Sequence, residues 1–316
     1  MTSRLLSVCA CLSLLVGRAA ADVSFAGANV HFAASAEGRK LLTARDDFIR
    51  RLSEFDRSAR MKVERRVTED EFLEFVGRST VAWSDDETSA IQRVLAAIQP
   101  AIARMRLSLP PTIQFVKTTG AEEGNAAYTR GSAIILPRKE LGKSAQELEK
   151  VICHELFHVV SRHNPELQEK LYGIIGFTKC DEVQLPPALA SRKITNPDAP
   201  RNDHVIRVQV DGQTESAVPI LLAKTERYDA KRGGEFFDYL QLKLLVLPHD
   251  RSPQVGESTR LVDIAEVSGF MEQVGRNTSY IIHPEEILAE NFALLVSKGE
   301  ARSPEILQKM GAVLSD

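Results

Sequence analysis

The pentapeptide His-Glu-Leu-Phe-His constrains this chain more than any other feature, because it places two histidines, His154 and His158, four residues apart. Ser144 followed three residues later by Glu147 is a capping-box pattern, which predicts a helix that begins shortly before the pentapeptide. On a helix, residues four apart lie on one face, one turn apart. We therefore expect the two imidazoles to point in the same direction.

This spacing is typical of a zinc site and gives each member of the motif a role. Two imidazole nitrogens one turn apart can both reach a single Zn²⁺ at about 2.0–2.1 Å. Glu155 lies between them and is offset around the helix, so that it can take a proton from a zinc-bound water and pass it to a leaving amine. Apolar residues flank the motif and predict a buried helix, in which unpaired polar groups are costly. The alternative is that ordinary hydrogen bonds satisfy both histidines.

A catalytic zinc also needs a third protein ligand and an open fourth position. The best source is the segment HPEEILAEN, residues 283–291, in which a proline starts a helix that carries Glu286 and Glu290 on one face. An acidic first turn also stabilises a helix through its dipole without any metal. Glu285 and His283 remain alternative ligands.

The two motifs together resemble those of the gluzincin clan of zinc metallopeptidases. In HtpX-type members the later helix carries Glu-x-x-Ala-Asp, and thermolysin-like members share the Glu-x-x-x-Asp spacing; this chain has Glu-Ile-Leu-Ala-Glu. The resemblance covers residues 151–160 and 283–291, and it implies a zincin-like domain with one zinc ion per chain. By this resemblance the zinc ligands are His154, His158 and Glu286, the catalytic base is Glu155, and Glu290 orients a ligand histidine through its other ring nitrogen.

The same clan suggests where a substrate would lie. Zincins commonly carry an edge strand just before the motif helix, and a peptide substrate adds to it as a further strand. Asn125, Ala126 and Ala127 lie where such a strand would begin, although a plain hairpin explains this segment equally well. A stabiliser for the oxyanion is also expected, and we assign Tyr280 and His283 as catalytic candidates for this role. Further candidates for it are Tyr128 and His204.

Element signals along the chain predict an α+β fold. Helical spacing covers about residues 37–59, and capping boxes begin helices at Thr68 and at Ser84, the latter running to about Pro100. Alternation predicts strands at 112–118, in the segment NAAYTRGSAIILP and within 204–247. The expected regions are a signal peptide at 1–21, a helical N-terminal region at 22–105 and a metallopeptidase domain at 106–316, with a strand-rich insertion at 179–260 between the two zinc-ligand helices.

The N-terminal residues are typical of export. Arg4 precedes an apolar run, and small residues at 19 and 21 suit a cleavage site, although an uncleaved anchor remains an alternative. No other segment has enough consecutive apolar residues to span a bilayer, so we expect no transmembrane segment in the mature chain. The net charge of −3, without a Lys/Arg block, argues against nucleic acid as a partner. Cys153 and Cys180 would remain after cleavage, either paired or as free thiols.

The sequence therefore predicts an exported, periplasmic or secreted, zinc-dependent metallopeptidase that hydrolyses bonds in a peptide or protein substrate. One alternative is an exported binding or assembly protein on a zincin scaffold, with a structural or vestigial zinc site. Another is an α+β protein without a metal, in which the His-Glu-x-x-His pattern is accidental.

Overall fold

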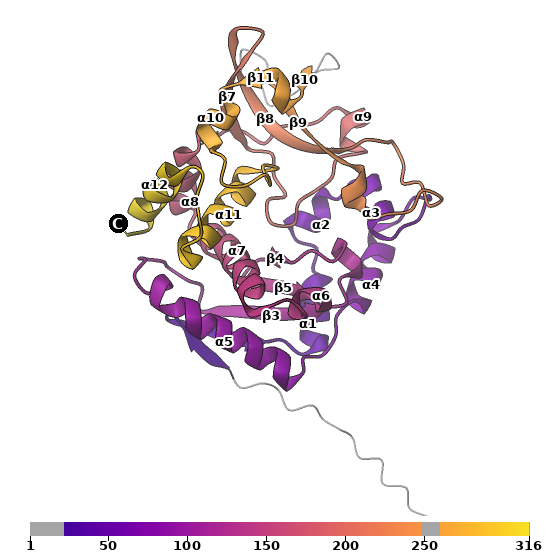
Figure 1. Ribbon diagram of the computed structural model, residues 1–316. Coiled ribbons are helices and arrows are strands. Elements are labelled where there is room, and N and C mark those ends of the chain that lie inside the picture. Colours follow the sequence, from indigo (N-terminus) through magenta and orange to yellow (C-terminus); the bar gives the residue numbers. More distant parts are fainter. Residues whose placement is uncertain (1–21, 248–259, 316) are drawn as a thin grey trace, which may run out of the picture.

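The computed structural model describes residues 22–247 and 260–315 (Figure 1). The predicted signal peptide, residues 1–21, lies outside the described residues. Helices and antiparallel strands occupy largely separate stretches of the chain, and the fold is α+β, as predicted. Within the described ranges, none of the helices has the length and apolar character needed to cross a membrane.

A five-stranded sheet forms the base on which the motif helix packs. Its strand order is β1-β2-β3-β5-β4, in which β3 runs parallel to both of its neighbours and β4 pairs antiparallel with β5 as an edge strand. β3 and the β4–β5 hairpin lie where the alternation predicts strands. The strand bounds are β1 Val23–Phe25, β2 Ala28–Phe32, β3 Thr112–Thr118, β4 Tyr128–Arg130 and β5 Ala133–Pro137.

Helices cover both faces of this sheet, because successive side chains on a strand point to opposite faces. On β3, Phe115 packs in a core with helices on one face, while its neighbour Val116 packs in a second core with helices on the other. Ile134 and Ile135 on β5 divide in the same way. The helices on the first face are α5 Asp85–Ile102 and α7 Ala145–His163; those on the second are α1 Ser35–Leu42, α2 Asp47–Arg51 and α4 Glu69–Arg78.

The predicted insertion forms a second, antiparallel sheet with strand order β10-β9-β8-β7-β11, and β6 pairs with β7 (Figure 1). Ile206 and Val208 on β7 are buried in the same core as α7, so the two sheets share one hydrophobic core. The strand bounds are β6 Phe177–Lys179, β7 His204–Val210, β8 Gln213–Ala223, β9 Leu240–Val246, β10 Arg260–Val262 and β11 Val267–Ser268.

Helix α11 (Pro284–Ser297) lies against α7 on the side away from the first sheet (Figure 1). Their contact is apolar along most of its length, and the rings of Phe157 and Phe292 are 5.7 Å apart. This packing brings the second motif beside the first. The remaining elements are α3 Glu54–Arg60, α6 Arg138–Leu141, α8 Pro165–Ile174, α9 Pro187–Ala190, α10 Phe270–Val274, α12 Pro304–Ser315, η1 Ala121–Glu123, η2 Phe236–Tyr239 and η3 Ile264–Glu266.

The N-terminal region differs from the sequence expectation in three respects. The single helix expected over residues 37–59 is divided into α1, α2 and α3, because Asp46 and Ser53 cap two new helix starts. Strands β1 and β2 precede these helices and join the first sheet, so residues 22–105 are not purely helical. Helix α5 continues through Pro100, which removes only one hydrogen bond near the helix end.

The two cysteines of the described chain are not paired. Cys153 is a free thiol in the core around α7, and Cys180 is a free thiol beside a different cluster under the second sheet. Of the two expectations stated for them, the structure therefore has the free thiols.

Candidate metal centre

The first motif is presented by helix α7, whose start is fixed by the predicted capping box. Ser144 accepts a hydrogen bond from the Glu147 backbone N–H, and Glu147 accepts one from the Ser144 backbone N–H. The helix buries its apolar residues against the sheet and α5. Its opposite side, which faces α11, carries His154, Glu155 and His158.

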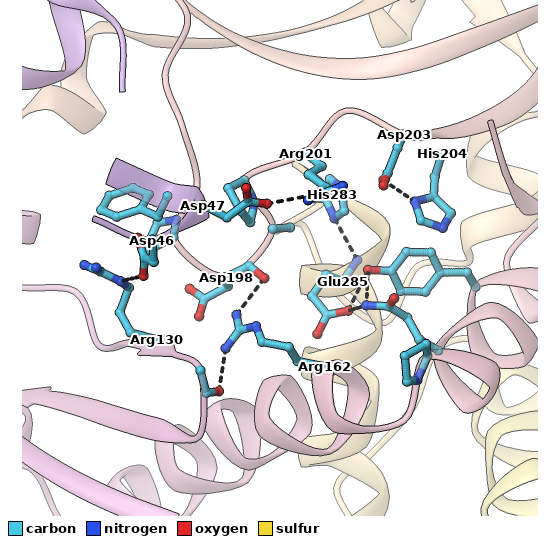
Figure 2. Close-up of a pocket in the computed structure, with 18 of the residues that line it drawn as sticks. Asp46, Asp47, Arg130, Arg162, Asp198, Arg201, Asp203, His204, His283 and Glu285 are labelled. Atoms are coloured by element: carbon cyan, nitrogen blue, oxygen red, sulfur yellow. Dashed lines mark hydrogen bonds and ion pairs between the residues drawn. The ribbon is translucent and has the colours of Figure 1, made fainter. Parts of the chain in front are cut away.

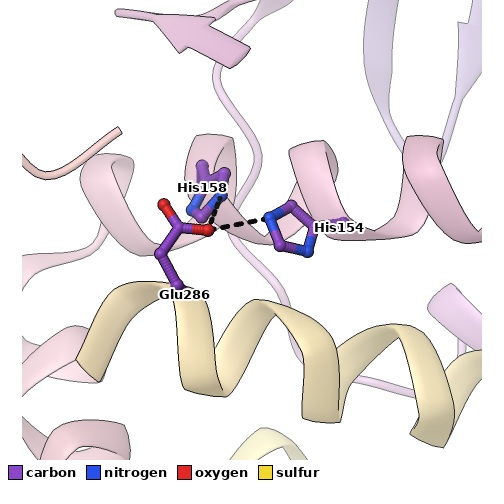
Figure 3. A group of neighbouring side chains, drawn as sticks. All are labelled: His154, His158 and Glu286. Carbon is purple, nitrogen blue, oxygen red and sulfur yellow. Dashed lines mark hydrogen bonds and ion pairs between the residues drawn. The ribbon is translucent and has the colours of Figure 1, made fainter. Parts of the chain in front are cut away.

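Three candidate ligand atoms meet between α7 and α11. His154 Nε2 lies 3.0 Å from Glu286 Oε2, and His158 Nε2 lies 3.6 Å from the same oxygen (Figure 3). All three atoms lie within 4.8 Å of one another. Ligands bound tetrahedrally to zinc at about 2.0–2.1 Å are separated by roughly 3.3 Å, so these spacings suit one shared zinc ion.

The other nitrogen of each histidine is held by a second carboxylate. His154 Nδ1 lies 3.0 Å from Glu290 Oε1, the position that the family resemblance implies for Glu290. His158 Nδ1 lies 3.0 Å from Glu285 Oε1. Glu285, an alternative ligand in the sequence analysis, therefore lies behind His158 and not beside the other ligand atoms. Both contacts make Nδ1 the protonated nitrogen and leave Nε2 free to bind a metal.

Glu285 is itself fixed by its neighbours. Its Oε2 accepts hydrogen bonds from Tyr172 Oη at 2.6 Å and Ser161 Oγ at 2.8 Å. Although burial opposes its ionisation, the hydrogen bond and charge of His158 lower the pKa of Glu285. The orientation of His158 is thus set by a buried, ionised and fully bonded carboxylate.

The charges at the centre favour a bound cation. Burial opposes the charged forms of both histidines, yet hydrogen bonds to Glu286 and Glu290 raise the pKa of His154 to about 10. The charges of Asp198 and Glu286 raise the pKa of His158 well above its usual value. Protons on the imidazoles therefore balance the buried carboxylates when no metal is bound. A divalent cation can supply the same positive charge through neutral imidazoles.

Two buried polar atoms at the centre are left without a partner. Within the described residues, His158 Nε2 and Glu155 Oε2 have no hydrogen-bond partner. Burial and the nearby charge of Asp198 raise the pKa of Glu155 to about 8. Because unpartnered buried polar atoms are costly, their convergence fits a site that binds a further group. The donor set of two imidazoles and one carboxylate is one that zinc accepts.

A cleft of about 490 Å³ opens on the ligand atoms. Tyr280 is 39% exposed on its rim, and its ring centre lies 6.4 Å from that of His154. Ala126 and Ala127 line the cleft, and Asn125 takes a left-handed turn (φ 65°) ahead of edge strand β4. Ala126, Ala127 and Tyr280 thus line the cleft at the metal centre, whereas Asn125 precedes them in the chain and does not line it.

The other candidates for oxyanion stabilisation lie elsewhere. His283 caps helix α11, where its Nδ1 accepts a hydrogen bond from the Glu285 backbone N–H, and it faces a separate cavity of about 570 Å³ (Figure 2). His204 lines that same cavity and contacts Asp203 and Glu169. Tyr128 is buried. Among these side chains only Tyr280 lines the metal cleft.

The segment between α9 and β7 contributes two residues that the sequence analysis did not identify. Asn196 Nδ2 donates a hydrogen bond to Glu286 Oε1 at 2.6 Å. Asp198 has a carboxylate oxygen within 4.8 Å of ligand-type atoms of Glu155 and His158. These two residues belong to the turn-rich sequence TNPDAP, whose composition carries no spacing signal for a metal site.

Comparison with known proteins gives one match. A family model described as the eCIS core domain matches residues 116–166, which run from within β3 to the start of α8. The matched residues include His154, Glu155 and His158 but not Glu286. No curated protein and no solved structure matches the chain.

Proposed function

We propose that this protein is an exported, zinc-dependent metallopeptidase with a zincin-like catalytic domain and one zinc ion per chain. The observation that carries the proposal is the combined geometry of the two motifs. Three ligand-type atoms converge, both histidines are fixed through Nδ1, and Glu155 lies beside them with an oxygen, Oε2, that has no hydrogen-bond partner among the described residues. Export rests on the pattern of residues 1–21 alone.

The residues that would hold zinc are His154, His158 and Glu286. Bound zinc supplies a Lewis acid that polarises a carbonyl and lowers the pKa of water. Glu290 and Glu285 keep Nδ1 of the two histidines protonated, so that each Nε2 lone pair faces the shared site. Asn196 holds Oε1 of Glu286, which leaves Oε2 directed at the histidines.

Glu155 is the proton carrier in this proposal. Its Oε2 is buried and unpartnered among the described residues, so it is free to accept a proton from the attacking water. Without metal, burial and the charge of Asp198 raise the pKa of Glu155 to about 8. The positive charge of zinc at the neighbouring ligands would lower this pKa, so that the carboxylate can accept the proton and then deliver it to the leaving nitrogen. Tyr280 reaches the cleft with an exposed side chain and is the candidate donor to the carbonyl oxygen of the substrate.

A second candidate function is a binding protein in which zinc is structural. The observation that favours it is Asp198, whose carboxylate approaches His158 and Glu155 closely enough to offer a fourth ligand. A closed coordination shell leaves no position for a substrate.

The substitution Glu155→Gln separates the two candidates. A metallopeptidase with this variant should retain about one zinc per chain and lose at least about 100-fold in the hydrolysis of a mixed peptide library. The exposed Glu166→Gln is the matched control and should keep the activity of the parent protein. A zinc-loaded parent that hydrolyses no peptide, and equals Glu155→Gln in every assay, would favour the binding protein.

A further inference from the structure

The segment Asn196–Pro200 crosses the candidate metal centre and divides the cleft from the neighbouring cavity. Asp198 lines the cavity of about 570 Å³ (Figure 2). It also lines the cleft of about 490 Å³ at the metal centre. Pro197, Ala199 and Pro200 line the cavity but not the cleft. We call this segment, Asn196–Pro200, the strap. A substrate in extended conformation would occupy space on both sides of the metal, and the strap lies between the two spaces.

The strap is bonded to the position where an extended peptide would add. Strand β4 is the edge of the first sheet, and β5 and α6 follow it before the motif helix α7. The Thr129 backbone N–H, which points away from β5, donates to Asp198 Oδ1 at 2.7 Å, and Thr129 Oγ1 donates to the same oxygen at 2.6 Å. A substrate strand would need this N–H for its own backbone carbonyl.

A cation from the motif helix completes the attachment. Arg162, four residues after His158, donates to the Gly131 carbonyl at 2.9 Å and to the Asp198 carbonyl at 3.0 Å (Figure 2). The strap therefore contacts the β4 edge in two ways. The Asp198 carboxylate accepts hydrogen bonds from Thr129, and the Arg162 guanidinium donates both to the strap and to the turn after β4. Hydrogen bonds that involve charged groups are stronger than neutral ones, which favours the docked strap.

The same segment also bonds to the ligand set. Asn196 Nδ2 donates to Glu286 Oε1, and Asn196 Oδ1 accepts from the Asp198 backbone N–H at 3.0 Å. Pro197 and Pro200 flank Asp198 and restrict the backbone, which lowers the entropy that the strap loses on docking. At one end the strap is anchored by an exposed ion pair between Arg201 and Asp47.

We propose that the strap Asn196–Pro200 is an autoinhibitory segment that occupies the substrate position on the edge of β4. This inference rests on the proposed peptidase function and adds its regulation. When the strap is docked, the Thr129 N–H and the passage between the two cavities are blocked. When Asp198 leaves Thr129, an extended peptide can bind along β4 and cross the metal centre.

The test measures hydrogen exchange and hydrolysis in the same zinc-loaded preparations. Asp198→Ala removes the acceptor of Thr129, and Pro200→Gly keeps every contact of Asp198 but loosens the strap. We expect the Thr129 amide to exchange at least about tenfold faster in Asp198→Ala, and hydrolysis of a mixed peptide library to rise in both variants. Glu166→Gln, an exposed substitution on α8 outside the strap and both cavities, is the control and should match the parent in both measurements.

Two sets of results would contradict the proposed autoinhibitory role of the strap without contradicting the proposed peptidase function. One is unchanged exchange at Thr129 in a folded Asp198→Ala protein that still binds zinc. The other is faster exchange with hydrolysis that is unchanged or lower in both variants. Absence of zinc and hydrolysis from the parent and all variants would instead remove the proposed function, and the regulatory role with it.

Discussion

At the scale of residues, the two candidate ligand histidines differ in the burial of the carboxylate that contacts Nδ1. The Glu285 side chain that holds His158 is 2% exposed and is bonded by Tyr172 and Ser161. The Glu290 side chain that holds His154 is 41% exposed. Loss of the Glu285 carboxylate should therefore lower the stability of the fold more than loss of the Glu290 carboxylate. Removing one member of a buried pair leaves an uncompensated polar group, whereas water can solvate the partner in an exposed pair.

This difference in burial predicts different losses of stability for two alanine substitutions. Glu285→Ala should destabilise the zinc-free protein by about 3–5 kcal/mol, because it breaks a buried pair. Glu290→Ala should cost less than about 1 kcal/mol, because that pair is partly exposed, and should weaken zinc binding by about 10–100-fold. Denaturant unfolding with a chelator present and zinc competition titrations give the two quantities. Equal losses of stability in both variants would contradict the assignment.

The capping histidine of α11 predicts a pH dependence of stability. Burial and the charge of His204 lower the pKa of His283 from 6.5 to about 4. The unfolded chain then binds a proton below pH 6.5 that the folded chain resists until about pH 4. The contribution of His283 is fully present above pH 6.5 and is lost as the pH falls toward 4, by up to about 3 kcal/mol.

His283→Asn tests this contribution, because asparagine accepts a helix-capping hydrogen bond without titrating. The free energy of unfolding of this variant should decrease less than that of the parent between pH 6.5 and 4. The measurement is urea unfolding across that range with a chelator present in both samples. Parallel curves for the two proteins would show that His283 titrates normally.

At the scale of elements, the centre is the junction of α7 and α11. The two helices already share an apolar contact, so the candidate ligands are brought together by packing before any metal binds. Zinc bound by His154, His158 and Glu286 would then link two helices that are far apart in the sequence. Such a link stabilises the folded chain because the unfolded chain does not hold the three ligands together.

Zinc removal should therefore lower the thermal midpoint. At free zinc of roughly 100 times Kd, the expected stabilisation is about 2.7 kcal/mol, or at least about 5 °C in Tm. Calorimetry of the parent with zinc and with chelator gives the shift, and Glu286→Ala should show little of it. A shift of the same size in Glu286→Ala would place the stabilising zinc elsewhere.

At the scale of the whole molecule, local sequence signals predicted most helices and strands. The division of the N-terminal helices and the two short strands β1 and β2 appeared only in the folded chain. The capping box at Ser144, the alternation over 112–118 and the proline that begins α11 identified the elements that carry the site. Asp46 and Ser53 divided an apparently continuous helix, and strands β1 and β2 are short, so spacing alone did not reveal them.

The candidate site divides in the same way. His154, Glu155 and His158 lie on one helix, so their spacing alone carried the prediction. Asn196 and Asp198 reach the centre from a turn-rich segment, and only the folded chain shows that they contact Glu286 and Thr129. The roles of Glu285 and Glu286 also depended on the rotation of α11 about its axis, which packing against α7 decides.

The central claim is that α7 and α11 together hold one zinc ion. Elemental analysis of the protein, purified without chelators and reconstituted with zinc, tests it most directly beside Glu286→Ala and the exposed control Glu305→Ala. We predict about one zinc per chain in the parent and the control, and a loss of most of it in Glu286→Ala. No zinc in the parent after reconstitution, or full occupancy in Glu286→Ala, would contradict the account.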